Sequence, residues 1–304
     1  MEPSRALTPS LPLAQTALPL FLHASAHPWA VWRERCVTGG LWVVALGVIG
    51  AFTWILGDLL YHGTSSLSLD FVLQPPLQAG RAGGISTVVV GTLLIVGVAI
   101  GSALPMSIGT AILLAEASNT ETSCGRLVRR SLDVLAGIPS IVFGLFGLAF
   151  FGQFFGWSIL SGGLTLACMI LPVLIRSTEE SLRVVPASLR HGAAALGLSP
   201  RAVLWHLTLP AATPGITAGL VLSMGRALAE TAALLFTAGA AIRMPTSLFD
   251  SARSLSYHIY LLAIEVPGGQ ERAYASAVVL VGLLLLLNGV AVLLTRRFQQ
   301  RLLQ

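Results

Sequence analysis

Two charged residues, Arg226 and Glu230, stand in an otherwise apolar stretch and are the strongest candidates for chemistry in this sequence. In a helix, this spacing would place both side chains on one face. The guanidinium of Arg226 could hold an anion through several donors, and Glu230 could hold or release that arginine. The alternative is a self-neutralising pair that only fixes helix packing. We expect a charged element of a polar pathway.

No arrangement typical of an enzyme accompanies this pair. The sequence contains no H-E-x-x-H motif and no glycine-rich phosphate-binding loop. The cysteines Cys36, Cys124 and Cys168 lack the spacing of metal ligands and are too few for a disulfide framework. We therefore expect no catalytic residue, no metal and no cofactor, and no ATP hydrolysis by a phosphate-binding loop of this chain.

The composition predicts an integral membrane protein. Charged residues make up 10% of the 304 residues, hydrophobic residues make up 55%, and the mean hydropathy is +0.82. A soluble protein carries roughly 25% charged residues. The arginines form no stripe, which argues against a nucleic-acid partner although the net charge is +5.

Six stretches are long and apolar enough to cross a bilayer as helices, each needing about 20 residues. They are Val37–Gly57, Ile85–Ala115, Val134–Phe151, Trp157–Ile175, Gly215–Ala241 and Ala273–Thr295. The second stretch is too long for one straight span and contains Pro105, so we expect it to kink or to project from the bilayer.

The arginines indicate the orientation. With both termini in the cytoplasm, thirteen arginines fall inside, four fall in outer loops, and Arg226 lies within a span. The sequence thus predicts a cytoplasmic tail at residues 1–35, a first span with its outer loop at 36–84, a transmembrane core at 85–297 and a second tail at 298–304. Residues 5–26 imitate a signal peptide, but Pro9, Pro12 and Pro19 interrupt the apolar run, so we expect a mobile tail.

A cytoplasmic segment, 176–210, separates the fourth and fifth predicted spans. It keeps a helical pattern, which Gly197 and Pro200 divide into two short helices before Leu209 and Pro210 end the second. This arrangement is typical of a docking element for a soluble partner. An amphipathic helix lying on lipid headgroups is the alternative.

The same segment resembles the loop by which permeases of ABC importers dock on their ATPase. The family pattern is E-A-A, three residues, G, nine residues, I-x-L-P. Its positions are filled here by His191, Gly192, Ala193, Gly197, Leu207, Leu209 and Pro210. The spacing matches throughout, but His191 replaces the glutamate, which removes one polar contact that the family pattern implies.

Further strings resemble the PstA-type permease of the phosphate importer. They are Gly83–Ile85, Val90–Thr92, Ala111–Glu116, Leu135–Gly147, Arg176–Glu180, Val185–Pro186 and Arg226–Ala238. In the last string the family reads R-A-x-G-E-T-A-P-L-L. Because Ala229 replaces its glycine and Ala233 its proline, we expect a straighter helix here. Ala232 favours this permease over its partner, which has methionine at that position.

The resemblance implies a type I ABC importer permease fold with six transmembrane helices in the inner membrane. It also implies four kinds of partner: a PstC-type permease, a PstB-type ATPase dimer, a PstS-type extracytoplasmic binding protein and inorganic phosphate. Arg226, Glu230 and Arg176 occupy positions that the family associates with phosphate passage. Arg176, at the end of the fourth predicted span, also fits a simple positive-inside anchor.

Three other interpretations remain open. An ABC permease for another oxyanion, such as sulfate or molybdate, would share the docking loop but should lack the Gly-Ile-Pro-Ser and Arg…Glu-Thr-Ala strings. A channel or secondary transporter often shows two similar halves, and none is visible here. An intramembrane enzyme would need a nucleophile and a base, which this sequence does not offer.

Overall fold

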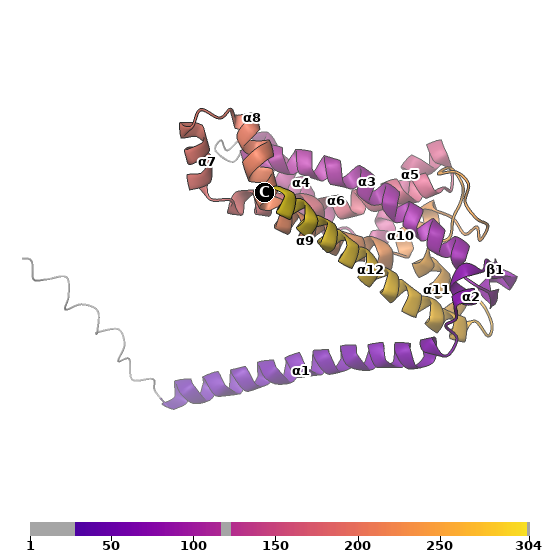
Figure 1. The fold of residues 1–304 in the computed structure, drawn as a ribbon. Coiled ribbons are helices and arrows are strands. Elements are labelled where there is room, and N and C mark those ends of the chain that lie inside the picture. The colour runs from indigo at the N-terminus through magenta and orange to yellow at the C-terminus, as the bar shows by residue number, and fades with distance from the viewer. Residues whose placement is uncertain (1–27, 117–122, 303–304) are drawn as a thin grey trace, which may run out of the picture. The chain divides into compact units, whose positions relative to one another are not determined.

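The computed structural model describes residues 28–116 and 123–302, and apart from one small hairpin its regular elements are helices (Figure 1). The signal-peptide-like segment, residues 5–26, therefore lies outside the described residues. By its internal contacts the chain divides into two compact units, residues 1–57 and 58–304. α1 (Pro28–Thr64) begins inside the predicted tail and contains the predicted first span, Val37–Gly57, within a longer apolar helix.

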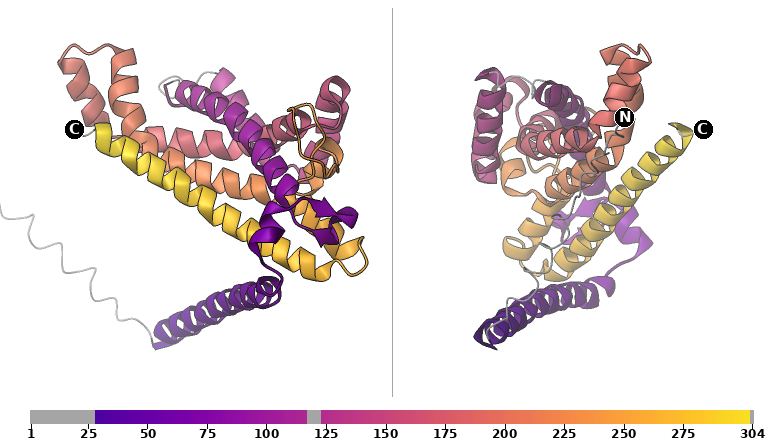
Figure 2. Two further views of the ribbon diagram at one scale, coloured as in Figure 1. Left: turned by 45° about the vertical axis from the view of Figure 1, so that its right-hand side comes forward. Right: turned by 90° about the vertical axis from the view of Figure 1, so that its left-hand side faces the viewer.

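Four long helices frame the second unit: α3 (Ser86–Glu116), α6 (Ile159–Val184), α9 (Leu209–Ala229) and α12 (Gln270–Leu302) (Figure 2). Each belongs to a segment long and apolar enough to cross a membrane, and with α1 they give five candidate spans. α12 continues through most of the predicted C-terminal tail. The 31 residues of α3 measure ~46 Å at 1.5 Å per residue, so this helix exceeds the hydrocarbon core, as predicted, and the helix assignment continues through Pro105.

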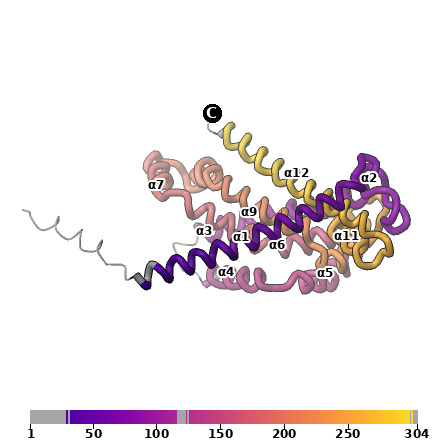
Figure 3. Tube along the Cα trace, turned by 90° about the horizontal axis from the view of Figure 1, so that it is seen from below, coloured from indigo at the N-terminus to yellow at the C-terminus, as the bar shows by residue number. Residues whose placement is uncertain are grey.

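The sixth candidate span is broken, which corrects the prediction of one helix over Val134–Phe151. α4 (Ser123–Ala136) and α5 (Ser140–Phe155) are bent by 108° at residues 137–139. Gly137 and Pro139 explain the break, because proline has no N–H to continue the helix and disfavours helical backbone at the residue before it. Figure 3 shows the pair along one side of the unit, away from α12.

α6 is the central helix and contacts α3, α4, α5, α9 and α10. It extends to Val184, nine residues beyond the predicted end of the fourth span at Ile175, so Arg176 lies within a helix and not in a loop. Small residues allow close packing along it. A side chain at Gly163 would overlap Val98 of α3, and one at Gly219 would overlap Ser177 of α6.

The segment 176–210 contains two helical pieces, as predicted, but the second does not end at Pro210. α7 (Ala187–Ala195) is followed by α8 (Pro200–Val203), and α8 runs through a single wide turn, η3 (Leu204–Thr208), directly into α9. In that turn the N–H of Leu209 bonds to the carbonyl of Leu204. Wider turns of this kind accommodate a proline, which cannot donate the regular helical bond.

One end of the unit, here named the outer end after the predicted orientation, consists of short elements. They are α2 (Leu69–Leu73), the antiparallel strands β1 (Pro76–Leu77) and β2 (Ala82–Gly83), the turn η1 (Gln78–Gly80) between them, α10 (Ala232–Thr237) and α11 (Leu255–Ile264). Pro76 pairs with Gly83, and Leu77 with Ala82. A loop over 238–254 joins α10 to α11.

Candidate functional site

Arg226 lies on the exposed side of α9, near its end. The neighbouring residues Ala227 and Leu228 are 1% and 2% exposed and belong to the main core, so the helix turns Arg226 away from it. Arg226 makes no hydrogen bond or ion pair with the residues that the structure describes. A guanidinium without a counter-ion on a spanning helix is unfavourable against lipid. We therefore expect this side of α9 to face a partner or water.

Glu230 does not continue that helix, which corrects the expectation of a shared helix face. α9 ends at Ala229, and Glu230 has extended backbone angles, φ −73° and ψ 127°. α10 starts two residues later, so the expectation of a straighter helix is also wrong. A carboxylate oxygen of Glu230 accepts the N–H of Ala233 at 3.4 Å, and its carbonyl accepts the hydroxyl of Ser256 from α11. Arg226 and Glu230 form no ion pair.

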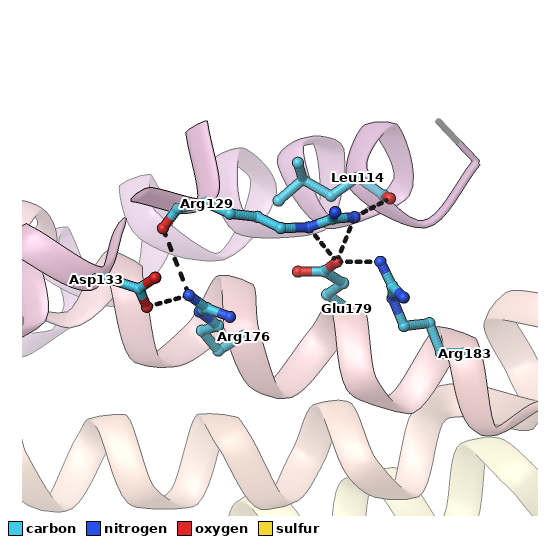
Figure 4. Close-up of polar contacts among 6 residues, drawn as sticks. All are labelled: Leu114, Arg129, Asp133, Arg176, Glu179 and Arg183. Atoms are coloured by element: carbon cyan, nitrogen blue, oxygen red, sulfur yellow. Dashed lines mark hydrogen bonds and ion pairs between the residues drawn. The ribbon is translucent and has the colours of Figure 1, made fainter. Parts of the chain in front are cut away.

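Arg176 lies on α6, in the part of the helix toward its C-terminus. It takes part in a charged cluster between α4 and α6 (Figure 4). Its guanidinium is paired with the carboxylate of Asp133. Next to this pair, the carboxylate of Glu179 accepts hydrogen bonds from the guanidinium of Arg129 at 3.1 Å and from that of Arg183 at 2.7 Å. Arg129 also donates to the carbonyl of Leu114 at 3.0 Å, which ties the end of α3 to the cluster.

The cluster lines an open polar cavity of about 300 Å³, bordered by Arg129, Arg176, Glu179, Glu180 and Arg183. The lining holds three guanidiniums and two carboxylates, and with Asp133, which pairs with Arg176, the cluster has three charges of each sign. Arginine stays charged at any physiological pH and binds oxyanions through paired donors. A small anion that entered the cavity would have to compete with these carboxylates for the arginines.

The residues of the docking loop lie on α7, the following turn and α8–α9. His191 and Gly192 are exposed on α7, whereas Ala193 is buried beneath it. Gly197 has φ +78°, a left-handed conformation that favours glycine, and ends α7. Leu207, Leu209 and Pro210 lie half-buried where the wide turn enters α9. The segment thus places the exposed helix α7 before a half-buried turn that continues into the spanning helix α9.

Sequence reasoning missed the partners that hold Arg176 in place. Asp133 is 43 residues from Arg176, and Arg129 is 50 residues from Glu179. The only signal was that these acidic residues stand beside predicted spans, Asp133 just before Val134–Phe151 and Glu179 shortly after Trp157–Ile175. A second missed group lies at the outer end, where Arg253, 9% exposed, donates to the carbonyls of Ala240 and Ala79. Among the residues described, no three His, Cys, Asp or Glu side chains could hold a metal ion.

Comparison with known proteins assigns a family to this arrangement. Residues 107–304 match the family described as "Binding-protein-dependent transport system inner membrane component". The chain is 31% identical over 264 residues to the "Probable ABC transporter permease protein YqgI" of Bacillus subtilis, covering 81% of this chain and 88% of that protein. It is 36% identical over 266 residues to the "Phosphate transport system permease protein PstA 2" of Mycobacterium bovis, covering 85% and 84%.

A solved structure shares the fold. The chain superposes with a TM-score of 0.58 on a chain from the crystal structure of a bacterial ABC transporter involved in the import of the acidic polysaccharide alginate. The match covers 88% of this chain and 98% of the other, at 15% sequence identity. At that identity the likeness shows the fold alone.

Proposed function

The chain belongs to the family of binding-protein-dependent transport system inner membrane components, and we propose that within it this chain is the PstA-type permease of an ATP-driven importer of inorganic phosphate. Proteins of this family are multi-pass subunits of the inner membrane and have no catalytic role. They work with an ATPase and a binding protein. The partners we propose are a PstC-type permease, a PstB-type ATPase dimer and a PstS-type binding protein.

The observation that carries the proposal is the exposed guanidinium of Arg226 on a spanning helix. A second permease of similar fold, placed against this side of α9, would enclose Arg226 between the two subunits. Phosphate carries one to two negative charges at neutral pH and needs a fixed cation to enter a passage of low dielectric constant. Similarity to a permease named for phosphate transport supports this choice of anion.

Arg176 and its cavity provide a second step on the cytoplasmic side. An anion that reaches the cavity would compete with Asp133 for the guanidinium of Arg176. Competition of this kind allows release, because a passage must bind its ion weakly enough to let it leave. We assign Arg226 and Arg176 to the translocation pathway on these grounds, whereas Glu230, which pairs with neither arginine, lies beside this pathway at the end of α9.

The proposed mechanism is alternating access. ATP binding closes the ATPase dimer, which moves the exposed helix α7, and the wide turn passes this movement directly to α9, because α8, η3 and α9 form one continuous segment. The helices then open the path outward, and the binding protein delivers phosphate toward Arg226. ATP hydrolysis resets the transporter.

Phosphate uptake tests the proposal. Cells that lack their own PstA-type subunit but keep its partners would receive this chain or Arg226→Gln, and uptake of radiolabelled phosphate would be measured with excess sulfate or molybdate. We expect saturable uptake that resists both competitors. Arg226→Gln should reduce uptake at least about tenfold, the loss of one charged hydrogen bond, while the complex still assembles.

Matched controls separate the possible outcomes. Arg297→Gln removes an exposed arginine from the far end of α12 and should leave uptake unchanged. Rescue only in cells lacking a PstC-type subunit would reverse the subunit assignment. An assembled complex without phosphate uptake would favour the permease for another oxyanion, and full uptake by Arg226→Gln would return this residue to a packing role.

A further inference from the structure

The break between α9 and α10 is held by two hydrogen bonds that both involve Glu230. We infer that Glu230 and Ser256 form a latch that fixes this break and so positions Arg226, with Glu230 acting as a hydrogen-bond acceptor and not as the counter-ion of Arg226. This inference rests on the proposed function, in which Arg226 contacts the anion. It gives Glu230 the role of a positioning residue.

The side-chain half of the latch caps α10. Ala233 is 0% exposed, so water cannot reach its N–H once the preceding helix has ended. A carboxylate oxygen of Glu230 accepts that N–H at 3.4 Å. A buried N–H without an acceptor costs about 1–3 kcal/mol. An uncharged oxygen in the same place could serve this bond, so the acceptor matters here more than the charge.

The backbone half of the latch joins the break to α11. The carbonyl of Glu230, released from α9, accepts the hydroxyl of Ser256, which is 6% exposed. Ser256 is itself held in place at the start of α11. Its hydroxyl lies 3.1 Å from that of Ser254, and the N–H of Leu255 bonds to the hydroxyl of Thr92 on α3 at 2.8 Å.

The latch is continuous with the outer end of the molecule. Immediately before α11, the buried guanidinium of Arg253 donates to Ala240 at 3.1 Å and to Ala79 at 3.3 Å. These bonds connect the loop 238–254 with the turn η1 of the outer hairpin. A displacement of that outer surface would therefore reach Glu230 through Ser256. Arg226 lies one helical turn before the break and would move with it.

Three variants test the latch. Glu230→Gln keeps an oxygen acceptor and removes the charge, Glu230→Ala removes both, and Ser256→Ala removes the tie to α11. We expect phosphate uptake by Glu230→Gln within about twofold of the unmodified transporter, and about a tenfold loss in Glu230→Ala and Ser256→Ala, as for one buried bond. Glu271→Ala, an exposed acidic residue in the first turn of α12, is the control for loss of charge.

A readout that does not depend on the substrate accompanies uptake. Hydrogen–deuterium exchange of the assembled transporter should show the amides of α10 exchanging about tenfold faster in Glu230→Ala, for the loss of one buried bond, and unchanged in Glu230→Gln. Equal loss of uptake in Glu230→Gln and Glu230→Ala would overturn the latch and leave a charge role for Glu230. Unchanged exchange in Glu230→Ala would also overturn it. Absence of phosphate uptake by the unmodified chain, with the exchange pattern intact, would count against the proposed substrate only.

Discussion

A methyl group at Gly147 should destabilise the protein, because α5 packs directly against two threonines at that point. A Cβ atom there would overlap the hydroxyl of Thr165 on α6 and would come within 2.8 Å of Cγ2 of Thr237 on α10. Both threonines are 0% exposed. Their hydroxyls donate to Ser161 and Ala233 at 2.7 and 2.8 Å, so neither side chain can turn away without losing a bond.

The magnitude follows from two costs. Overpacking a filled core costs about 1–3 kcal/mol, and breaking the buried bond of Thr165 costs about 1 kcal/mol more. Gly147→Ala should therefore lower stability by about 2–4 kcal/mol. Thr165→Ala removes the overlapping hydroxyl and its methyl group together, so the double variant should recover about 1 kcal/mol or more of this loss.

Heating the assembled transporter and measuring the fraction that stays monodisperse would rank these variants. Gly152→Ala is the matched control on the same helix, because its closest neighbour is the flexible tip of Leu148 at 3.3 Å. We expect Gly147→Ala to have the lowest midpoint and Gly152→Ala to match the unmodified protein. A normal midpoint for Gly147→Ala, or no recovery in the double variant, would refute the packing argument.

Three further perturbations have defined outcomes. Glu179→Gln removes the negative charge shared by Arg129 and Arg183. Because both arginines are partly exposed, we expect a loss of stability of about 1–3 kcal/mol. The midpoint of thermal unfolding should fall in this variant and stay unchanged in Glu180→Gln. Gly197→Val strains a left-handed residue without a clash inside the chain, so ATP hydrolysis should continue without matching uptake, and normal coupling in this variant would contradict the argument. The N–H groups of Thr246 and Ser247 lower the pKa of Asp250 below 3.8, so the loop keeps this stabilisation above pH 3.8 and loses it as the pH falls through the lowered pKa. Limited proteolysis should therefore cut residues 244–252 faster in acid and, at pH 7, in Asp250→Asn; equal cutting at pH 7 would contradict this.

The length and apolarity of the spans could be predicted from the sequence, because crossing a bilayer requires both. Breaks within spans were harder to predict. Gly137 and Pro139 are a local signal for the bend between α4 and α5, but a stretch chosen by apolarity alone passed over them. The connection from α8 to α9 was wrong in the opposite sense. Pro210 indicated the end of a helix, but the wide turn before it lets the helix continue.

The candidate site was predictable in its residues and not in its geometry. Arg226 is visible as an isolated charge in an apolar stretch. The partners of Arg176 are not visible, because Asp133 reaches it only through the packing of α4 on α6. Spacing along a sequence fixes a shared helix face only where the helix is continuous. At Glu230 that condition fails.

The failure at Glu230 has a physical cause that local sequence does not contain. Residues 227–233 include four alanines and no glycine or proline, so their intrinsic preference favours one continuous helix. The break persists because the hydroxyl of Ser256 donates to the carbonyl of Glu230 and the N–H of Ala233 donates to the Glu230 carboxylate. Each bond contributes about 1 kcal/mol, which is comparable to the helical preference that it opposes. One local bond, from Ala233 to the side chain of Glu230, and one distant bond, from Ser256 to its carbonyl, therefore hold the backbone beside Arg226, and we expect the loss of either to change it.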